Sequence, residues 1–339
     1  MSNPEEFKPV PFYFINTTRK KELSPAEAGK AMKRLKDAGY GGCIFFNKPP
    51  TGFSREEYLS DYWFEVTENF IIAAGEQQLE FWINDGYDFP PGDVAGRIEA
   101  VAPALKQRRL KRFPDGHIEA VEVDWGFPAF EEPESSRLFI ELLYEEYRKR
   151  LGKYFGNGIT GFFSDADNRR VNHFTLPLLN GETYYPWSRD FGGEFRKRFG
   201  YEIGPRLSEL FDGTSHSLHH DYWTLAGELY QRWFRNNYEW CRKHGLKYAF
   251  HTSDTGPFSL KECPRSSLFW EGEPLKLLEH SDCPGTDHEL AALDGGTHYD
   301  KRFFFPEASL GGGTEKLYNC NFSETKFDLR AKYASSAAF

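Results

Sequence analysis

Short β-rich runs alternate with amphipathic segments of helical spacing along most of this chain, and this pattern limits the fold more than any other feature. The runs at 10–16 and 42–47 are each followed by a segment with apolar residues on one side. Repeated strand and helix units are typical of a parallel sheet, because each helix carries the chain back to the start of the next strand. We therefore predict an α/β fold of the (β/α)8 TIM-barrel type.

Capping signals locate two of the predicted helices. Ser24 and Glu27 form a capping-box pattern with Pro25 at the first helical position, and Ser54 with Glu57 repeats the capping-box spacing. Further helices are predicted at 97–110, 135–151 and 221–244. Further strands are predicted at 79–85, 158–165 and 247–252, with a sixth near 277–283. About six of eight barrel strands are thus counted, so we expect an incomplete barrel whose C-terminal continuation is missing.

One domain accommodates the whole chain, 1–339, in this interpretation. Its 339 residues lie within the size range of a single α/β barrel that carries insertions. A strand-like run followed by a Pro- and Glu-rich stretch predicts a hairpin insertion at about 111–134. A second insertion is predicted at about 168–220, on the face formed by the strand ends.

Charge and composition exclude several classes of partner. The net charge of −9 and the pI near 5.7 argue against nucleic acid, because an acidic surface repels phosphate backbones. No apolar stretch is long enough to cross a bilayer, and residues 1–9 lack the pattern of an export signal. The five cysteines include no C-x-x-C pair, which fits reduced thiols. We therefore expect a soluble cytoplasmic protein with no membrane contact.

Aromatic residues make up 17% of the chain, more than packing requires. Flat rings stack on the apolar faces of sugars, although many of these rings will belong to the core. The composition is therefore compatible with a carbohydrate partner.

Polar residues stand where the predicted strands end. In a parallel barrel the active site lies at the carboxyl ends of the strands. Asp and Asn also cap turns and helices, so any single residue of this kind is weak support. Their recurrence at five strand ends favours a site. The residues at these ends are Asn16, Asn47, Asn84, Asp85, Asp165, Asp167, His251, Ser253 and Asp254.

Paired carboxyl groups are the requirement for cleaving a glycosidic bond, with one acid for the leaving oxygen and one base or nucleophile across the ring. The acidic strand ends supply such groups. Metal-dependent hydrolysis is the rival chemistry, because His280, Asp282, Asp287 and His288 lie close together in the sequence, but their spacing matches no ligand motif. No nucleophile elbow, dinucleotide fingerprint or P-loop occurs.

Eight sequence blocks in collinear order resemble glycoside hydrolase family 106, the α-L-rhamnosidase-like enzymes, and their unclassified bacterial relatives. The blocks resemble the family's first five strands, a sixth block and two of its helices, and they span nearly the whole chain. They are PFYFIN at 11–16, DAGYGGCIFF at 37–46, YLSDYWFE at 58–65, FWINDGYDFPPGDVAGR at 81–97, ITGFFSDAD at 159–167, GLKYAFHT at 245–252, HSDCPGTDHE at 280–289 and KYASSAA at 332–338.

The resemblance implies an inverting glycosidase that removes a terminal sugar such as L-rhamnose, with a carboxylic acid on the fourth strand as proton donor. It also implies a divalent cation such as calcium, whereas the residues themselves indicate no metal site and no cofactor. The chain departs from the family at two positions, because Ala166 and Gly86 stand where the family has Glu. The family's base, a Glu after the seventh strand, is expected beyond Phe339.

Three interpretations remain open. The first is a glycoside hydrolase with Asp165 or Asp167 as the acid. The second is a catalytically inactive barrel that binds carbohydrate, and the third is a structural domain whose aromatic residues are all core. In the first two, the predicted carbohydrate-binding residues are Asn16, Asn84, Asp85, Trp187, His251, Asp254, Trp270, Asp282 and Asp287.

Overall fold

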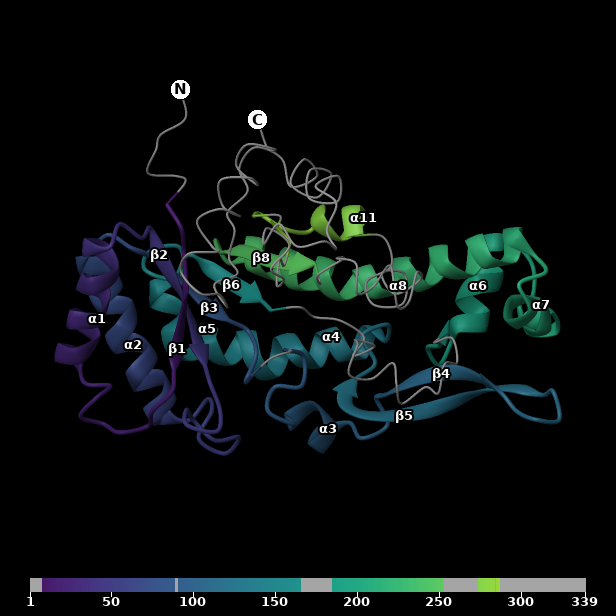
Figure 1. Cartoon of the computed structure of the whole chain (residues 1–339), viewed down its shortest axis with the longest axis horizontal. Coiled ribbons are helices and arrows are strands. Elements are labelled where there is room, and N and C mark those ends of the chain that lie inside the picture. The colour runs from purple at the N-terminus through teal and green to yellow at the C-terminus, as the bar shows by residue number, and fades with distance from the viewer. Residues whose placement is uncertain (1–7, 89–90, 166–184, 253–273, 284, 287–339) are drawn as a thin grey trace, which may run out of the picture.

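A parallel sheet of six strands forms the centre of the fold (Figure 1). The computed structural model describes residues 8–88, 91–165, 185–252, 274–283 and 285–286. The strands lie side by side in chain order, β1-β2-β3-β6-β8-β9, and every neighbouring pair is parallel. They are β1 (Phe12–Ile15), β2 (Gly42–Asn47), β3 (Glu80–Asn84), β6 (Gly161–Ser164), β8 (Lys247–Thr252) and β9 (Gly285–Thr286). The first five predicted strands are confirmed.

Helices return the chain to one and the same face of this sheet, which we call the helix face. They are α1 (Pro25–Asp37), α2 (Asp61–Glu76), α4 (Pro133–Phe139) with its continuation α5 (Glu145–Leu151), and α8 (His216–Lys243). Phe45 of β2 and Ile83 of β3 pack among these helices, whereas Ile44 and Trp82 belong to a separate cluster. Successive side chains of a strand point to opposite faces. That separate cluster therefore marks the opposite face, and its buried members are Val10, Ile44, Trp82, Phe163, Ala249 and Cys283.

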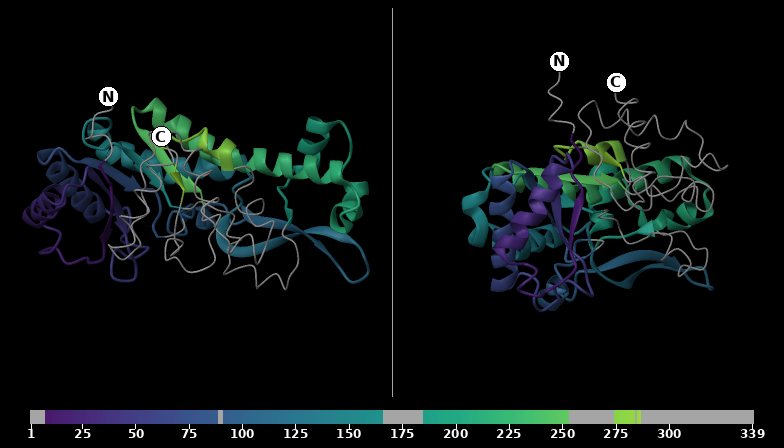
Figure 2. Two further views of the ribbon diagram at one scale, coloured as in Figure 1. Left: turned by 45° about the horizontal axis from the view of Figure 1, so that its top comes forward. Right: turned by 60° about the vertical axis from the view of Figure 1, so that its left-hand side comes forward.

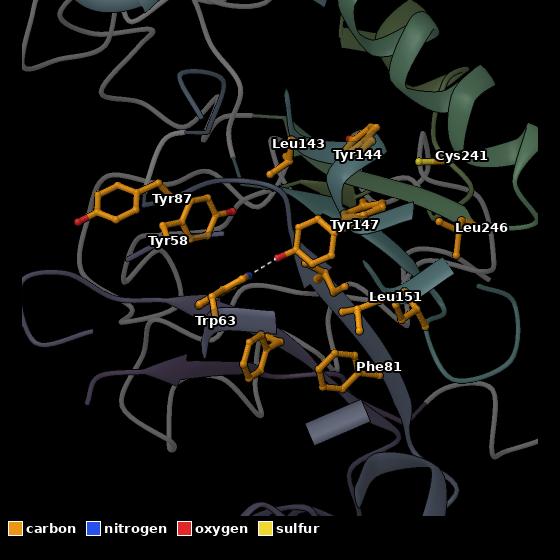
Figure 3. Close-up of a cluster of buried hydrophobic side chains, with 14 of the residues drawn as sticks. Tyr58, Trp63, Phe81, Tyr87, Leu143, Tyr144, Tyr147, Leu151, Cys241 and Leu246 are labelled. Atoms are coloured by element: carbon orange, nitrogen blue, oxygen red, sulfur yellow. Dashed lines mark hydrogen bonds between the residues drawn. The ribbon is translucent and has the colours of Figure 1, made fainter. Parts of the chain in front are cut away.

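Aromatic side chains fill the layer between the sheet and the helices. Figure 3 shows Trp63 of α2 beside Tyr147 of α5, where the indole Nε1 donates a hydrogen bond to the Tyr147 hydroxyl at 2.9 Å. Phe162 of β6 stacks on Tyr144 with 4.4 Å between the ring centroids. Both tyrosines are fully buried. Much of the unusual aromatic content is therefore core.

Parts of the two predicted insertions, the hairpin and residues 185–212, pack together as a second lobe with its own hydrophobic core. Figures 1 and 2 show α8 running from the sheet to this lobe. Leu110, Tyr185, Phe191 and Leu210 form that core together with the first half of α8. The elements of the lobe are the hairpin strands β4 (Lys106–Arg112) and β5 (Ile118–Pro128), the short strand β7 (Tyr185–Pro186), the helices α6 (Phe191–Phe199) and α7 (Leu207–Asp212), and a 3-10 turn (Gly204–Arg206).

The hairpin begins earlier than the sequence predicted, and it replaces part of a predicted helix. Instead of a helix over 97–110, α3 (Arg97–Val101) ends after five residues. Pro103 follows closely, and proline disfavours the helical conformation of the residue before it. Arg109 then pairs with Val121 in the antiparallel β4–β5 ladder.

Three further sequence predictions differ from the structure, the first in its capping bond and the other two in their boundaries. The Ser24 hydroxyl donates to the carbonyl oxygen of Lys21 and does not cap α1. The Ser54–Glu57 capping box does form, at 3.1 and 3.3 Å, but α2 begins later, after an N-cap at Ser60. The segment predicted as the sixth strand overlaps the short helix α11 (Pro274–Leu278), and the strand that pairs with β8 is β9.

The close approach of β6 to β8 depends on Gly161, which lies opposite Lys247. A Cβ on Gly161 would lie 2.1 Å from the Lys247 carbonyl oxygen, so either strand would have to move. We expect Gly161→Ala to lower the free energy of unfolding by about 3 kcal/mol, because overpacking displaces backbone. The control Gly29→Ala, in α1 with open space around it, should raise that free energy by roughly 0.5–1 kcal/mol. Urea denaturation measures both, and equal effects would contradict the argument.

Candidate functional site

The carboxyl ends of β3 and β6 bring two predicted site residues to the face opposite the helices. Asn84 ends β3 two residues after Trp82, and Asp165 follows β6 two residues after Phe163. Trp82 and Phe163 both belong to the cluster on the opposite face. The alternation of side chains therefore directs Asn84 and Asp165 to this face as well. Both residues are buried, with 2% and 7% of their surface exposed.

His251 joins Asp165 through the register of the sheet. Ser164 pairs with Phe250 across β6 and β8, so the next pair in register is Asp165 with His251. Neighbouring strands lie about 4.8 Å apart. The backbones of these two predicted site residues are thus adjacent at the strand ends.

Asn84 carries a buried amide that is poorly satisfied. Its Nδ2 donates to the Gly86 carbonyl oxygen at 3.3 Å, and among the residues that the structure describes its Oδ1 accepts no hydrogen bond. Asn47, at the end of the neighbouring strand, differs: its amide bonds to Phe53 N, Phe53 O and Tyr87 O at 2.8–3.0 Å. An acceptor without a donor is costly in a buried place. Asn84 is therefore suited to accept a hydrogen bond from a ligand hydroxyl group or water.

Asp85 lies on the helix face, away from Asn84 and Asp165. Its Oδ2 accepts hydrogen bonds from the hydroxyl groups of Tyr144, at 2.7 Å, and Ser164, at 2.5 Å. The side chain has no exposed surface. Burial, followed by the charge of Asp85, raises the pKa of Tyr144 well above its usual value. Tyr144 is thus held in its neutral form, as a hydrogen-bond donor.

Two other predicted site residues lie apart from Asn84 and Asp165, whereas a third, Asn16, continues the series of Phe12 and Phe14 toward their face. Asn16 is exposed just after β1. Trp187 stacks on Phe191 in the second lobe, with 4.5 Å between the ring centroids. Asp282 lies near the amino end of β8, where it accepts from the Tyr248 backbone N–H and pairs with Arg242 at 2.8 Å. The predicted residues outside the described part of the chain are Asp167, Asp254, Trp270 and Asp287, and of His251 only the backbone is described.

Sequence reasoning missed a group of two rings and one cation at the rim of the same face. Lys48 directly follows β2, and its Nζ lies 5.8 Å from the ring centroids of both Phe14 and Phe46. The same ammonium pairs with Asp88 at 3.3 Å. The sequence signal is alternation, because Lys48 continues the series Ile44 and Phe46 along one face. An apolar ring surface beside a cation thus borders the strand ends.

Metal ligation was the rival chemistry, and the resemblance implied calcium. Calcium takes six to eight oxygen ligands. Within the described ranges, no group of three or more His, Cys, Asp or Glu side chains is placed to hold a metal ion. His280, one residue of the rival set, lies beside Tyr238, and burial lowers the pKa of His280. Calcium binding therefore stays a prediction from the resemblance.

A small hollow of about 20 Å³ lies between α3 and β5, at the base of the hairpin. Its walls include Ile98, Leu105, Val123 and Phe127, with Asp93 among the polar lining residues. This volume holds about one water molecule. The hollow is therefore too small for a sugar ring.

Comparison with solved structures identifies the class of fold. The chain aligns with a rhamnosidase from Novosphingobium sp. PP1Y over 94% of its own length, with a TM-score of 0.55 and 9% identity. A GH20 catalytic module of the pneumococcal exo-β-D-N-acetylglucosaminidase StrH aligns over 99% of this chain and 85% of that chain, with a TM-score of 0.40 and 8% identity. The GH20 exo-β-N-acetylglucosaminidase from Vibrio harveyi aligns over 98% and 57%, with a TM-score of 0.37 and 10% identity. The two GH20 scores are too low to establish a shared fold. The score against the rhamnosidase shows a fold shared with a glycoside hydrolase.

The chain spans about half the length of that rhamnosidase, because the alignment covers 55% of it. No protein-family model and no curated protein matches the chain. Among the described helices, none is both long and apolar enough to cross a membrane. The structural similarity therefore shows the fold and does not show the activity.

The contrast between Asn84 and Asn47 leads to a stability prediction. We expect Asn84→Leu to leave the free energy of unfolding within about 1 kcal/mol of its original value, because a poorly satisfied buried amide is replaced by an apolar group of similar size. Asn47→Leu should lower that free energy by about 3 kcal/mol or more, because it leaves three backbone groups without their partner. Chemical denaturation measures both variants. Equal losses would contradict our interpretation of Asn84.

Proposed function

We propose that this protein is a glycoside hydrolase whose active site lies at the carboxyl ends of its parallel strands, with Asp165 as the proton donor. The observation that carries this proposal is the position of Asp165, a buried carboxyl group on the same face as Asn84 that directly follows the last β6–β8 pair, Ser164 with Phe250. The fold shared with a rhamnosidase supports the same conclusion.

The chemistry assigns a distinct role to each of these groups. A protonated Asp165 donates its proton to the glycosidic oxygen as the bond to the anomeric carbon breaks. The Asn84 Oδ1 accepts a hydrogen bond from a sugar hydroxyl group. In an inverting enzyme a second carboxylate activates water on the opposite side of the ring, about 6.5–9.5 Å from the acid. Asp167 is the alternative proton donor, and the second carboxylate is not assigned to a described residue.

The substrate that we propose is a glycan with a terminal sugar such as L-rhamnose, cleaved with inversion. Rhamnose carries a methyl group in place of a hydroxymethyl group, so it presents more apolar surface than most hexoses. Phe14, which is half-buried, offers an apolar ring at the rim of the site, and the buried Phe46 supports it with 5.4 Å between the ring centroids. We also propose that the chain is related to glycoside hydrolase family 106 and that its parallel sheet is part of a closed barrel, as the resemblance implies.

A second candidate function is carbohydrate binding without hydrolysis. The observation that favours it is Ala166, which stands directly after Asp165 where the resembling family has Glu. Loss of a general acid typically lowers a rate by a hundredfold to ten-thousandfold. A site with the binding groups and without this Glu would hold a sugar and leave its bond intact.

A panel of nitrophenyl glycosides that includes the α-L-rhamnoside tests the proposed hydrolysis. We expect the protein to release nitrophenol from one of them, and NMR of the first sugar product should show the inverted anomer. Asp165→Asn should lower kcat by about a hundredfold or more, because an amide cannot supply the proton. The control Asp37→Asn, on the exposed end of α1, should leave kcat unchanged.

The same panel, measured together with calorimetric binding of the free sugars, separates the two functions. Binding of a free sugar without cleavage of any glycoside would support the carbohydrate-binding protein and end the proposal of an enzyme. If no sugar binds and no glycoside is cleaved, both proposals fail.

A further inference from the structure

We propose that Asp85 is a positioning residue, which fixes the carboxyl ends of β3 and β6 from the helix face and thereby sets the position of Asp165. Its partners in this role are Tyr144, Ser164 and Tyr248. The inference rests on the proposed function, and it replaces the sequence-based expectation that Asp85 binds the sugar.

The hydrogen bonds of this group link three strands and one helical segment. The Tyr144 and Ser164 hydroxyl groups donate to Asp85 Oδ2, and the Tyr248 hydroxyl group donates to Ser164 Oγ at 3.0 Å. Asp85 follows β3, Ser164 ends β6, and Tyr248 lies in β8. None of these four side chains has exposed surface. A sugar on the opposite face therefore has no access to Asp85.

Burial makes these bonds necessary. A carboxylate removed from water is stable only where hydrogen bonds or charges replace its hydration. Oδ2 receives two short hydroxyl bonds, at 2.7 and 2.5 Å, which is the range of charge-assisted bonds. Tyr144 stays a donor, because burial and the neighbouring charge of Asp85 raise its pKa. The group therefore holds one fixed arrangement.

A π-helical turn between α4 and α5 delivers Tyr144 to this carboxylate. The turn spans Ile140–Tyr144 within an otherwise continuous helix. The turn ends at Tyr144, whose fully buried hydroxyl group donates to Asp85. Turns of this kind occur often at functional sites. The π-helical turn thus coincides with the residue that contacts Asp85.

The hydrogen-bonded group around Asp85 is next to the proposed proton donor, Asp165, in the chain. Ser164 directly precedes Asp165, so its anchored side chain fixes the backbone from which the Asp165 carboxyl group projects. The Asp85 backbone N–H also donates to the Phe163 carbonyl oxygen at 3.0 Å, which continues the β3–β6 ladder past the end of β3. Loss of the anchor should therefore misplace the acid and leave sugar contacts on the opposite face in place. A misplaced group lowers the rate of the chemical step more than it lowers affinity.

The test compares Tyr144→Phe with a matched control, Tyr222→Phe. Tyr222 is also fully buried and donates one hydrogen bond, to the Pro186 carbonyl oxygen, but it belongs to the core of the second lobe. We expect Tyr144→Phe to lower kcat tenfold or more with KM within twofold, and to speed hydrogen exchange of the Asp85 amide tenfold or more. The Tyr222→Phe control should change neither quantity by more than twofold. Kinetics on the cleaved aryl glycoside and NMR-detected exchange give the two readouts.

Three outcomes would overturn the inference. These are an unchanged kcat, a raised KM at unchanged kcat, or unchanged exchange at Asp85. If Tyr144→Phe does not fold, Ser164→Ala replaces it, with Ser136→Ala in α4 as the control. If the original protein cleaves no glycoside, the proposed function fails, and the exchange of the Asp85 amide alone then decides whether the anchor exists.

Discussion

The alternation of side chains along the parallel strands is the constraint on which the rest of this structure depends. It separates the aromatic layer under the helices from the cluster on the opposite face. It also gives two residues adjacent in the sequence different roles. Asn84 lies on the face opposite the helices, and Asp85 faces the helices and is bonded there. The environment of each residue at a strand end therefore depends on which of the two faces its place in the alternation gives it.

The sequence predicted the sheet well, because strong local signals determine it. The five strands from β1 to β8 were identified by apolar runs and by the helices between them. The predicted helix over 97–110 was wrong because the basic residues of β4 have high helix propensity, whereas pairing with β5 in the hairpin decides their conformation. The sixth strand was misplaced for a similar reason, since β9 is too short to carry a periodic signal.

The candidate site was predicted only in part. Residue type and position at a strand end identified Asn84, Asp85 and Asp165 as candidates, but the face that each occupies depends on register. Trp187 was predicted to stack on a sugar ring, and in the structure it stacks on Phe191, four residues further along the chain. Lys48 was not predicted as a site residue, because a single lysine belongs to no recognisable sequence motif. Its relation to Phe14 arises from strand pairing between β1 and β2.

One helix, α8, belongs to both hydrophobic cores. Its first half contributes Leu218, Tyr222 and Leu229 to the second lobe, and its second half contributes Trp233 and Trp240 to the layer beneath the sheet. Neither core can lose its packing without removing support from a helix of 28 residues that the other core also needs. The second lobe and the sheet therefore both depend on α8 for their packing.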